Sequence, residues 1–293
     1  MDLYVNRYDV IFLICLLSIL IYSCSEPTEG CIDVSARNFD VSADVDCCRK
    51  PPECCCQYPT LSLNLFYKLT GEDTLANMST NFKLKRYYAL QNSTDSIRID
   101  SFHLFISNIR PTDNSLGDSI QTLESIRVRT SDGQGDIIEQ TFPDNIALVD
   151  FENFQYTLGT YRSVSGYNEL NYNIGIPANL AAVDPVNVLD NHPLSNDYTK
   201  LYNSNDRRFI SGRVGFRVKR SNEERFIVHE IADPCPITQN FALPILAVRG
   251  QNLPILLRIN TLEVFKGIIF DVPMEDISLI INENLKSSIS IVE

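Results

Sequence analysis

Basic residues are scarce in this sequence. It holds 25 lysines and arginines against 37 aspartates and glutamates, which gives a formal net charge of −12 at pH 7. A phosphate backbone would be repelled by such a chain rather than bound through counterion release. The charge balance therefore excludes nucleic acid as a partner.

The familiar catalytic motifs are also missing. The chain has no Gly-x-Ser-x-Gly elbow, no Gly-rich phosphate loop and no His-Glu-x-x-His pair. Carboxylates are numerous, but a general acid/base pair is defined by a separation in space that sequence spacing does not give. We expect a binding protein and not an enzyme.

Only one apolar run is long. It extends from Ile11 to Tyr22, follows a polar head that contains Arg7, and leads into Ser23 and Cys24. At about twelve residues it would form a helix about 18 Å long, against roughly 30 Å of bilayer hydrocarbon. This layout predicts a signal peptide over residues 1–23 and no permanent transmembrane anchor.

The end of that run resembles the bacterial lipobox, at which the chain is cut before a cysteine whose thiol carries lipid. The matching segment is Ile21-Tyr22-Ser23-Cys24. The resemblance implies that Cys24 becomes a lipidated N-terminus, which would anchor the protein to the outer membrane, on the periplasmic side or at the cell surface. The alternative is an ordinary cleaved signal peptide with a chance cysteine.

Cysteines are concentrated near the N-terminus. The chain has nine, of which Cys15 lies in the signal peptide and Cys24 is the lipidation candidate. The other seven are Cys31, Cys47, Cys48, Cys54, Cys55, Cys56 and Cys235. Export favours disulfides, and an odd number leaves one thiol unpaired. A thiolate metal site is the alternative, although the paired two-residue spacing typical of such sites is missing.

Acidic residues mark a tether over residues 24–58. Its stretch from Gly30 to Cys47 resembles a short acidic module of bacterial surface proteins that is similar to thrombospondin type 3 repeats. The resemblance implies a calcium site, because clustered carboxylate and amide oxygens suit that cation. Its ligands would be Asn38, Asp40, Asp44 and Asp46. A solvated acidic linker is the alternative.

Period-two alternation dominates from residue 59 to residue 293. Leu61, Leu63 and Leu65 alternate with Ser62 and Asn64, as in a strand with one buried face. Further strands are expected over 82–88, 97–107, 126–129, 167–174, 213–219, 225–230, 255–260 and 267–272. No amphipathic helical stripe longer than two or three turns is evident, so we expect a single all-β domain of the β-sandwich type.

Histidine is rare. The three are His103, His192 and His229, and imidazole is a ligand for copper and zinc. By strand alternation, His103 shares a face with Ile97, Ile99 and Phe105, and His229 shares one with Ile227. Taken singly, each histidine also fits a hydrogen-bonded structural role.

Four segments, read in order, resemble the MbnP-like family of exported, often lipid-anchored bacterial proteins, some of them encoded beside copper-linked systems. They are Ile106-Ser107-Asn108-Ile109, Asn173-Ile174-Gly175-Ile176-Pro177-Ala178-Asn179-Leu180, His192-Pro193-Leu194-Ser195 and Phe226-Ile227-Val228-His229. The resemblance covers about residues 59–293. It implies a copper site formed by His192 and His229, with His103 as a third candidate, and a metal-handling or surface protein as partner.

The functional half of the family pattern is incomplete here. Tyr202 retains only the tyrosine of a Met-Tyr-Trp-x-Trp stretch, and Glu230 follows His229 where relatives have Leu-Gly. Tryptophan is absent, so the oxidised tryptophan beside the copper of some relatives has no counterpart. The competing hypothesis is a cell-surface or glycan-binding β-sandwich without metal, with the loops 111–123 and 184–205 as its recognition edges.

Overall fold

The structure is a computed structural model. It describes residues 26–48, 54–69, 82–90, 93–131, 137–162, 165–188, 192–195 and 200–292. The chain divides into two compact units at Gln57/Tyr58. We call the first the Cys-rich unit and the second the β domain, and we describe each by itself.

The elements run in the following order. In the Cys-rich unit they are β1 (Glu29–Gly30) and β2 (Val45–Asp46). In the β domain they are β3 (Thr60–Lys68), β4 (Tyr87–Ala89), β5 (Ser96–Asp113), β6 (Asp118–Ser119), β7 (Ser125–Ser131), β8 (Ile137–Pro143), β9 (Ile146–Val149), β10 (Gln155–Thr160), β11 (Gly166–Ile174), α2 (Ala178–Ala181), η2 (Pro185–Asn187), β12 (Tyr202–Asn203), β13 (Arg208–Phe209), β14 (Gly212–Arg220), β15 (Glu223–Ile231), β16 (Cys235–Leu246), β17 (Leu253–Asn260), α3 (Thr261–Val264), α4 (Met274–Ser288) and β18 (Ile289–Ile291).

The Cys-rich unit is held by three nested disulfides. They join Cys31 to Cys56, Cys47 to Cys55 and Cys48 to Cys54. A segment this short has too little apolar surface for a core of its own, and cross-links compensate by restricting the unfolded chain. The expectation of disulfides is confirmed, and Cys235 is a free thiol in the β domain.

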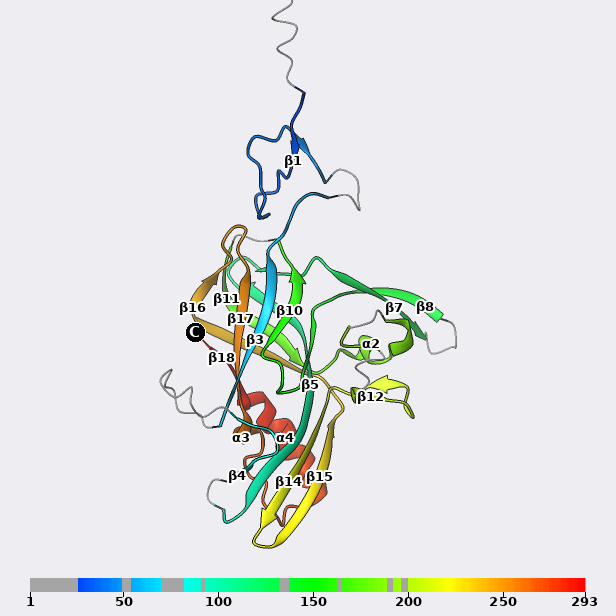
Figure 1. Ribbon diagram of the computed structural model, residues 1–293, viewed down its shortest axis with the longest axis vertical. Helices are drawn as coiled ribbons and strands as arrows, with labels where there is room; N and C mark the ends of the chain where they lie inside the picture. The colour runs from blue at the N-terminus through cyan, green and yellow to red at the C-terminus, as the bar shows by residue number, and fades with distance from the viewer. Residues whose placement is uncertain are drawn as a thin grey trace, which may run out of the picture. The chain divides into compact units, whose positions relative to one another are not determined.

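The β domain is built from two sheets. The smaller has the order β10-β3-β17-β18, and Figure 1 shows β3, β10 and β17 side by side. The larger follows the path β15-β14-β5-β11-β16, with β4, β6 and β9 also paired to β5. One core joins residues of both sheets, among them Leu63 on β3 and Leu104 on β5. The predicted all-β, sandwich-like class is confirmed.

A second, smaller core lies on the other face of β5. Phe105 packs there with residues from β7, β9 and the chain from α2 to β13, while its neighbours Leu104 and Ile106 face the main core. Both faces of β5 are thus covered at mid-strand. Such a strand is rigid, because moving it would disturb close packing on two sides.

A β-bulge changes the phase of β5. Gly215 on β14 is opposite Ser101, but the next residue, Phe216, is opposite Ile99, so Asp100 is one residue too many. An extra residue moves every later side chain to the other face. The prediction that His103 shares a face with Ile97 and Ile99 is therefore wrong, whereas its shared face with Phe105 is retained.

Three local expectations also need correction. α4 spans 15 residues, longer than expected, and buries Ile277, Ile281 and Leu285 at four-residue spacing. The predicted strand 267–272 is instead an irregular connection between α3 and α4. Of the predicted strand 82–88, only the end is extended, in β4.

In the described part of the chain, no helix has the length and apolarity needed to cross a membrane.

Candidate metal-binding site

His192 has both ring nitrogens engaged. The backbone N–H of Leu194 donates to Nδ1 at 3.1 Å, so the ring proton sits on Nε2, which lies 3.0 Å from Oδ1 of Asp144. Proline at 193 favours an extended backbone at His192. The imidazole of His192 then accepts the hydrogen bond of the Leu194 amide, which closes the turn. His192 could bind an ion only after giving up one of these two bonds.

His103 lies on the same side of the larger sheet, among charges of both signs. Burial lowers the pKa of His103, and the Lys200 ammonium and Arg213 guanidinium lower it further, while the carboxylates of Asp150 and Glu152 act in the opposite direction. Lys200 and Asp150 also line the pocket that contains His192 and Asp144.

His229 points to the opposite face of that sheet. Across the strands, His229 is opposite Val214, which is opposite Phe102, whereas His103 belongs to the neighbouring row with Arg213 and Glu230. Residues directly opposite one another share a face, and successive residues alternate. His103 and His229 cannot bind one ion within this sheet, and among the described residues no histidine joins a close group of three metal-binding side chains.

The surroundings of His229 do form a pocket. It has a volume of about 370 Å³ and lies between the turn from β15 to β16 and helix α4. The wall includes His229, Cys235, Asp233 and Lys286, and also Glu230, whose carboxylate pairs with Arg213 on the other face of the sheet. We call this the His229 pocket. It places an imidazole and a free thiol beside one cavity.

Helix α4 orients the imidazole. Ser278 Oγ lies 3.1 Å from Nδ1 of His229, and Asn282 Oδ1 lies 3.4 Å from Nε2. Ser278 and Asn282 are four residues apart, so both project from one face of the helix. Burial lowers the pKa of His229, because the charged form loses hydration. The lowered pKa favours the neutral ring, and a metal could bind only after one of these two contacts is given up.

A buried hydroxyl accompanies Cys235. Tyr172 is 2% exposed, and its hydroxyl has no hydrogen-bond partner among the described residues. Burial raises the pKa of Tyr172, and the charge of an ionised Cys235 nearby raises it further. A buried polar group without a partner costs about 1–3 kcal/mol of stability.

Two of the segments used for the family resemblance, 173–180 and 226–229, reach this pocket through Ile174 and His229. Ser107 on β5 donates its hydroxyl hydrogen bond to the carbonyl of Gly175 at 2.7 Å, where β11 ends. Gly175 has φ +109°, and a Cβ there would lie 2.6 Å from Ser211 Cβ and 2.9 Å from Pro234 Cα. Only glycine lets the chain leading to Cys235 pack this closely. These segments build the wall of the site.

The side chains expected to bind calcium are engaged in hydrogen bonds within the Cys-rich unit. One oxygen of Asp40 accepts hydrogen bonds from the amide and hydroxyl of Ser42, which lower the pKa of Asp40. Asp44 accepts from the amide of Thr28, and Asn38 bonds Cys55 and Gln57. Among the described residues, Asp40, Asp44 and Asp46 do not form a close group, so the structure gives no support to calcium at these positions.

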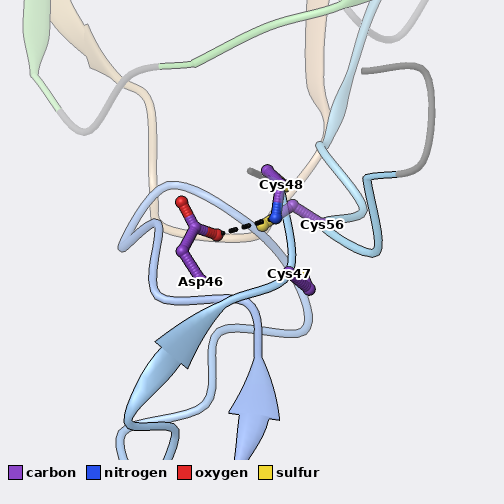
Figure 2. Close-up of side chains that lie close together, drawn as sticks. All are labelled: Asp46, Cys47, Cys48 and Cys56. Carbon is purple, nitrogen blue, oxygen red and sulfur yellow. Dashed lines mark hydrogen bonds between the residues drawn. The ribbon is translucent and has the colours of Figure 1, made fainter. Parts of the chain in front are cut away.

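Another group of donors does converge in the Cys-rich unit. Asp46, Cys47, Cys48 and Cys56 each place a ligand-type atom within 4.8 Å of the others, and all four residues are half-buried (Figure 2). All three sulfurs belong to disulfides, which do not bind cations as thiolates do. Cys24, the predicted lipidation site, lies outside the described residues.

Sequence reasoning identified His229 but not its surroundings. The sequence predicts Cys235 only as a disulfide candidate and does not mark Tyr172, Ser278 or Asn282 as site residues. Ser278 and Asn282 were detectable in principle, because they share the four-residue spacing of α4. His229 and Cys235 line the same pocket because the chain bends between β15 and β16. No local sequence pattern predicts that bend.

Comparison with known proteins gives one match. The family model described as MbnP matches residues 59–280. No curated protein and no solved structure matches the chain. The matched segment covers most of the β domain, including His229 and Cys235 on the wall of the His229 pocket. The chain belongs to the MbnP family.

Proposed function

We propose that this protein is an exported copper-binding module of the MbnP family and that the His229 pocket takes the ion. The observation that carries this proposal is the placement of His229 and Cys235 on the wall of one cavity. A thiolate and an imidazole are ligands that suit Cu(I). The family model supports an association with copper, and the donor types in the pocket fit that ion.

The chain's own groups prepare this pocket for a cation. Burial favours the neutral form of His229, and the Ser278 hydroxyl fixes the ring when it accepts a hydrogen bond from Nδ1–H, which leaves Nε2 for the ion. This tautomer requires Nε2 to give up its long contact with Asn282. Asp233 adds a negative and Lys286 a positive charge to the wall, and the Cys235 thiol loses its proton when it binds metal.

Competitive titration of the purified, disulfide-intact chain with Cu(I) tests this site. We expect one equivalent to bind with at least micromolar affinity, and His229→Ala or Cys235→Ser to abolish most of that uptake. His192→Ala and His103→Ala are matched controls that should keep it. Equal uptake by His229→Ala and wild type would exclude the pocket.

Export and lipid anchoring at Cys24 belong to the same proposal. They are supported by the short apolar run and the lipobox-like segment before Cys24. The protein would then sit in the cell envelope as a binding module without catalytic activity. Labelling of growing cells with a fatty acid should mark wild type and not Cys24→Ala. Native protein that retains Met1 and an unmodified Cys24 would contradict this.

A second candidate is a surface interaction module without metal. The row Tyr87, Arg98, Arg217 and Phe226 runs across four strands, with Arg98 over the ring of Tyr87 and Arg217 over that of Phe226. Phe226 is still 53% exposed, and exposed aromatic and arginine side chains are typical of binding surfaces. If Phe226→Ala removes glycan or protein binding while copper stays at background, this candidate is favoured.

A further inference from the structure

Strand β15 has an unpaired outer edge. It is the first strand of the path β15-β14-β5-β11-β16, so it has a neighbour on one side only. Figure 1 shows it on the side of the β14–β15 hairpin that faces away from β5. Among the described residues, no backbone group of β15 forms a hydrogen bond outside its ladder with β14. A row of free N–H and C=O groups is a template for another strand.

The hairpin turn identifies the residues that carry these free groups. The two-residue turn 221–222 makes Arg220 and Glu223 the hydrogen-bonded pair that closes the hairpin. In an antiparallel ladder, bonded and non-bonded pairs alternate, so the odd-numbered residues of β15 bond to β14. The even-numbered residues direct both their backbone groups to the free edge and their side chains to the outer face of the sheet. They are Glu224, Phe226, Val228 and Glu230.

This edge lacks the features that usually protect a strand from pairing. All nine residues of β15 pair with β14 without a register shift, and none of them is proline. The strand at the other end of the larger sheet, β16, contains Pro236 and Pro244 and shifts its register against β11. In the smaller sheet, β10 has a register shift and β18 spans three residues. Prolines, bulges and short length discourage edge pairing, and β15 has none of them.

The outer side chains of β15 make the strand complementary to itself. Phe226 is 53% and Val228 is 47% exposed. In an antiparallel pair of two β15 strands centred on Ile227, Phe226 of each copy lies opposite Val228 of the other. A shift of two residues in one direction places Glu224 opposite Val228, and the reverse shift places Phe226 opposite Glu230. Only the register centred on Ile227 pairs apolar with apolar side chains.

We propose that β15 pairs with β15 of a second copy of this chain, so that the larger sheet continues across the two-fold axis of a symmetric dimer. The exposed Phe226 and Val228 side chains of the two copies then cover one another.

The charges on β15 are compatible with this pairing. Glu224 of one copy lies opposite Glu230 of the other, and like charges at such positions repel. Each carboxylate is already paired within its own chain, Glu224 with Arg217 at 3.0 Å and Glu230 with Arg213 at 2.7 Å. These arginines reduce the repulsion across the axis. His229 faces helix α4, so the dimer does not depend on the copper site.

Analytical ultracentrifugation of the disulfide-intact chain tests the proposal, with Cys24→Ala so that no lipid drives association. Strand-edge contacts are small and weak, so the concentration series should extend to a few hundred micromolar, roughly the range of weak complexes. We expect the mass to rise from one chain toward two. Leu243→Lys, which changes an exposed apolar side chain on β16, should dimerise like wild type.

Two variants of Val228 should prevent the association. Val228→Pro removes an N–H that points to the free edge and leaves the ladder with β14 intact, so the chain should fold and stay monomeric. Circular dichroism checks that it folds. Val228→Lys keeps the N–H but places a charge opposite Phe226, and it should weaken the dimer at least tenfold. Wild type that stays monomeric over the whole series, or a folded Val228→Pro that dimerises like wild type, would overturn the proposal.

Disulfide cross-linking tests the register. Directly opposed residues in a bonded pair have Cα atoms about 5.5 Å apart, a distance that suits a disulfide. In a Cys235→Ser background, a mixture of Phe226→Cys and Val228→Cys chains should cross-link on mild oxidation much faster than either variant alone. Equal rates in the mixture and in the separate variants would contradict the register centred on Ile227.

Discussion

Arg220 forms a two-point ion pair with Asp95, a residue 125 positions earlier in the chain. Its Nε lies 2.7 Å from Oδ1 and its Nη2 lies 2.9 Å from Oδ2. The amide of Phe270 donates to the same carboxylate at 2.8 Å. The Asp95 side chain is fully buried, so this pair joins the start of β5, the end of β14 and the connection between α3 and α4.

Removing this carboxylate should destabilise the β domain. Because Asp95→Asn loses charge-assisted hydrogen bonds at a buried position, we expect the free energy of unfolding to fall by about 2–3 kcal/mol. Chemical denaturation of both proteins measures this difference. Asp271→Asn is the control, since it removes a second and largely exposed partner of Arg220 and should have a much smaller effect.

The same pair predicts a dependence on pH. Hydrogen bonds from Arg220 hold the pKa of Asp95 below its ordinary value in the folded protein. A lowered carboxyl pKa stabilises the fold above the unfolded-state value, and this contribution is lost as the pH falls below about 4. The stability difference between wild type and Asp95→Asn should narrow from pH 5 to pH 3. A constant difference would show that Asp95 does not titrate in this way.

A side chain at Gly175 should disturb both the fold and the pocket. Gly175→Ala places a methyl group against Ser211 and Pro234 in a backbone conformation that disfavours alanine. We expect a loss of about 1–3 kcal/mol in unfolding free energy. Gly267→Ala, at φ +85° with open space around the added Cβ, should cost less and is the control for crowding. Equal losses would leave no role for crowding.

We expect His192 to contribute to the stability of the β domain and not to copper binding. His192→Ala removes the contacts with Asp144 and with the Leu194 amide, at about 0.5–1.5 kcal/mol for each hydrogen bond. We expect a lower melting temperature and unchanged copper uptake. Loss of copper without loss of stability would instead assign the ion to the His192 side of the sheet.

The sequence allowed the fold class to be predicted, because period-two alternation in segments such as 60–68 reports a buried face directly. It did not allow the placement of the histidines to be predicted. One extra residue at Asp100 reverses the faces of β5 after that point, and nothing in the alternation up to Ile99 signals it.

The candidate site was only half predictable for a similar reason. The surroundings of His229 come from three places: the turn that carries Cys235, the end of β11, and helix α4 near the C-terminus. Contacts between distant segments are set by tertiary packing, which local periodicity does not encode. The cysteine pairing in the Cys-rich unit was open for the same reason, since spacing alone leaves several connectivities possible.

X-ray absorption at the copper edge, on disulfide-intact chain loaded with one equivalent of Cu(I), tests the copper site most directly. The account predicts one sulfur and at least one imidazole nitrogen bound to the metal, with the sulfur lost in Cys235→Ser and the imidazole lost in His229→Ala. A spectrum that keeps both ligands in these variants would contradict it.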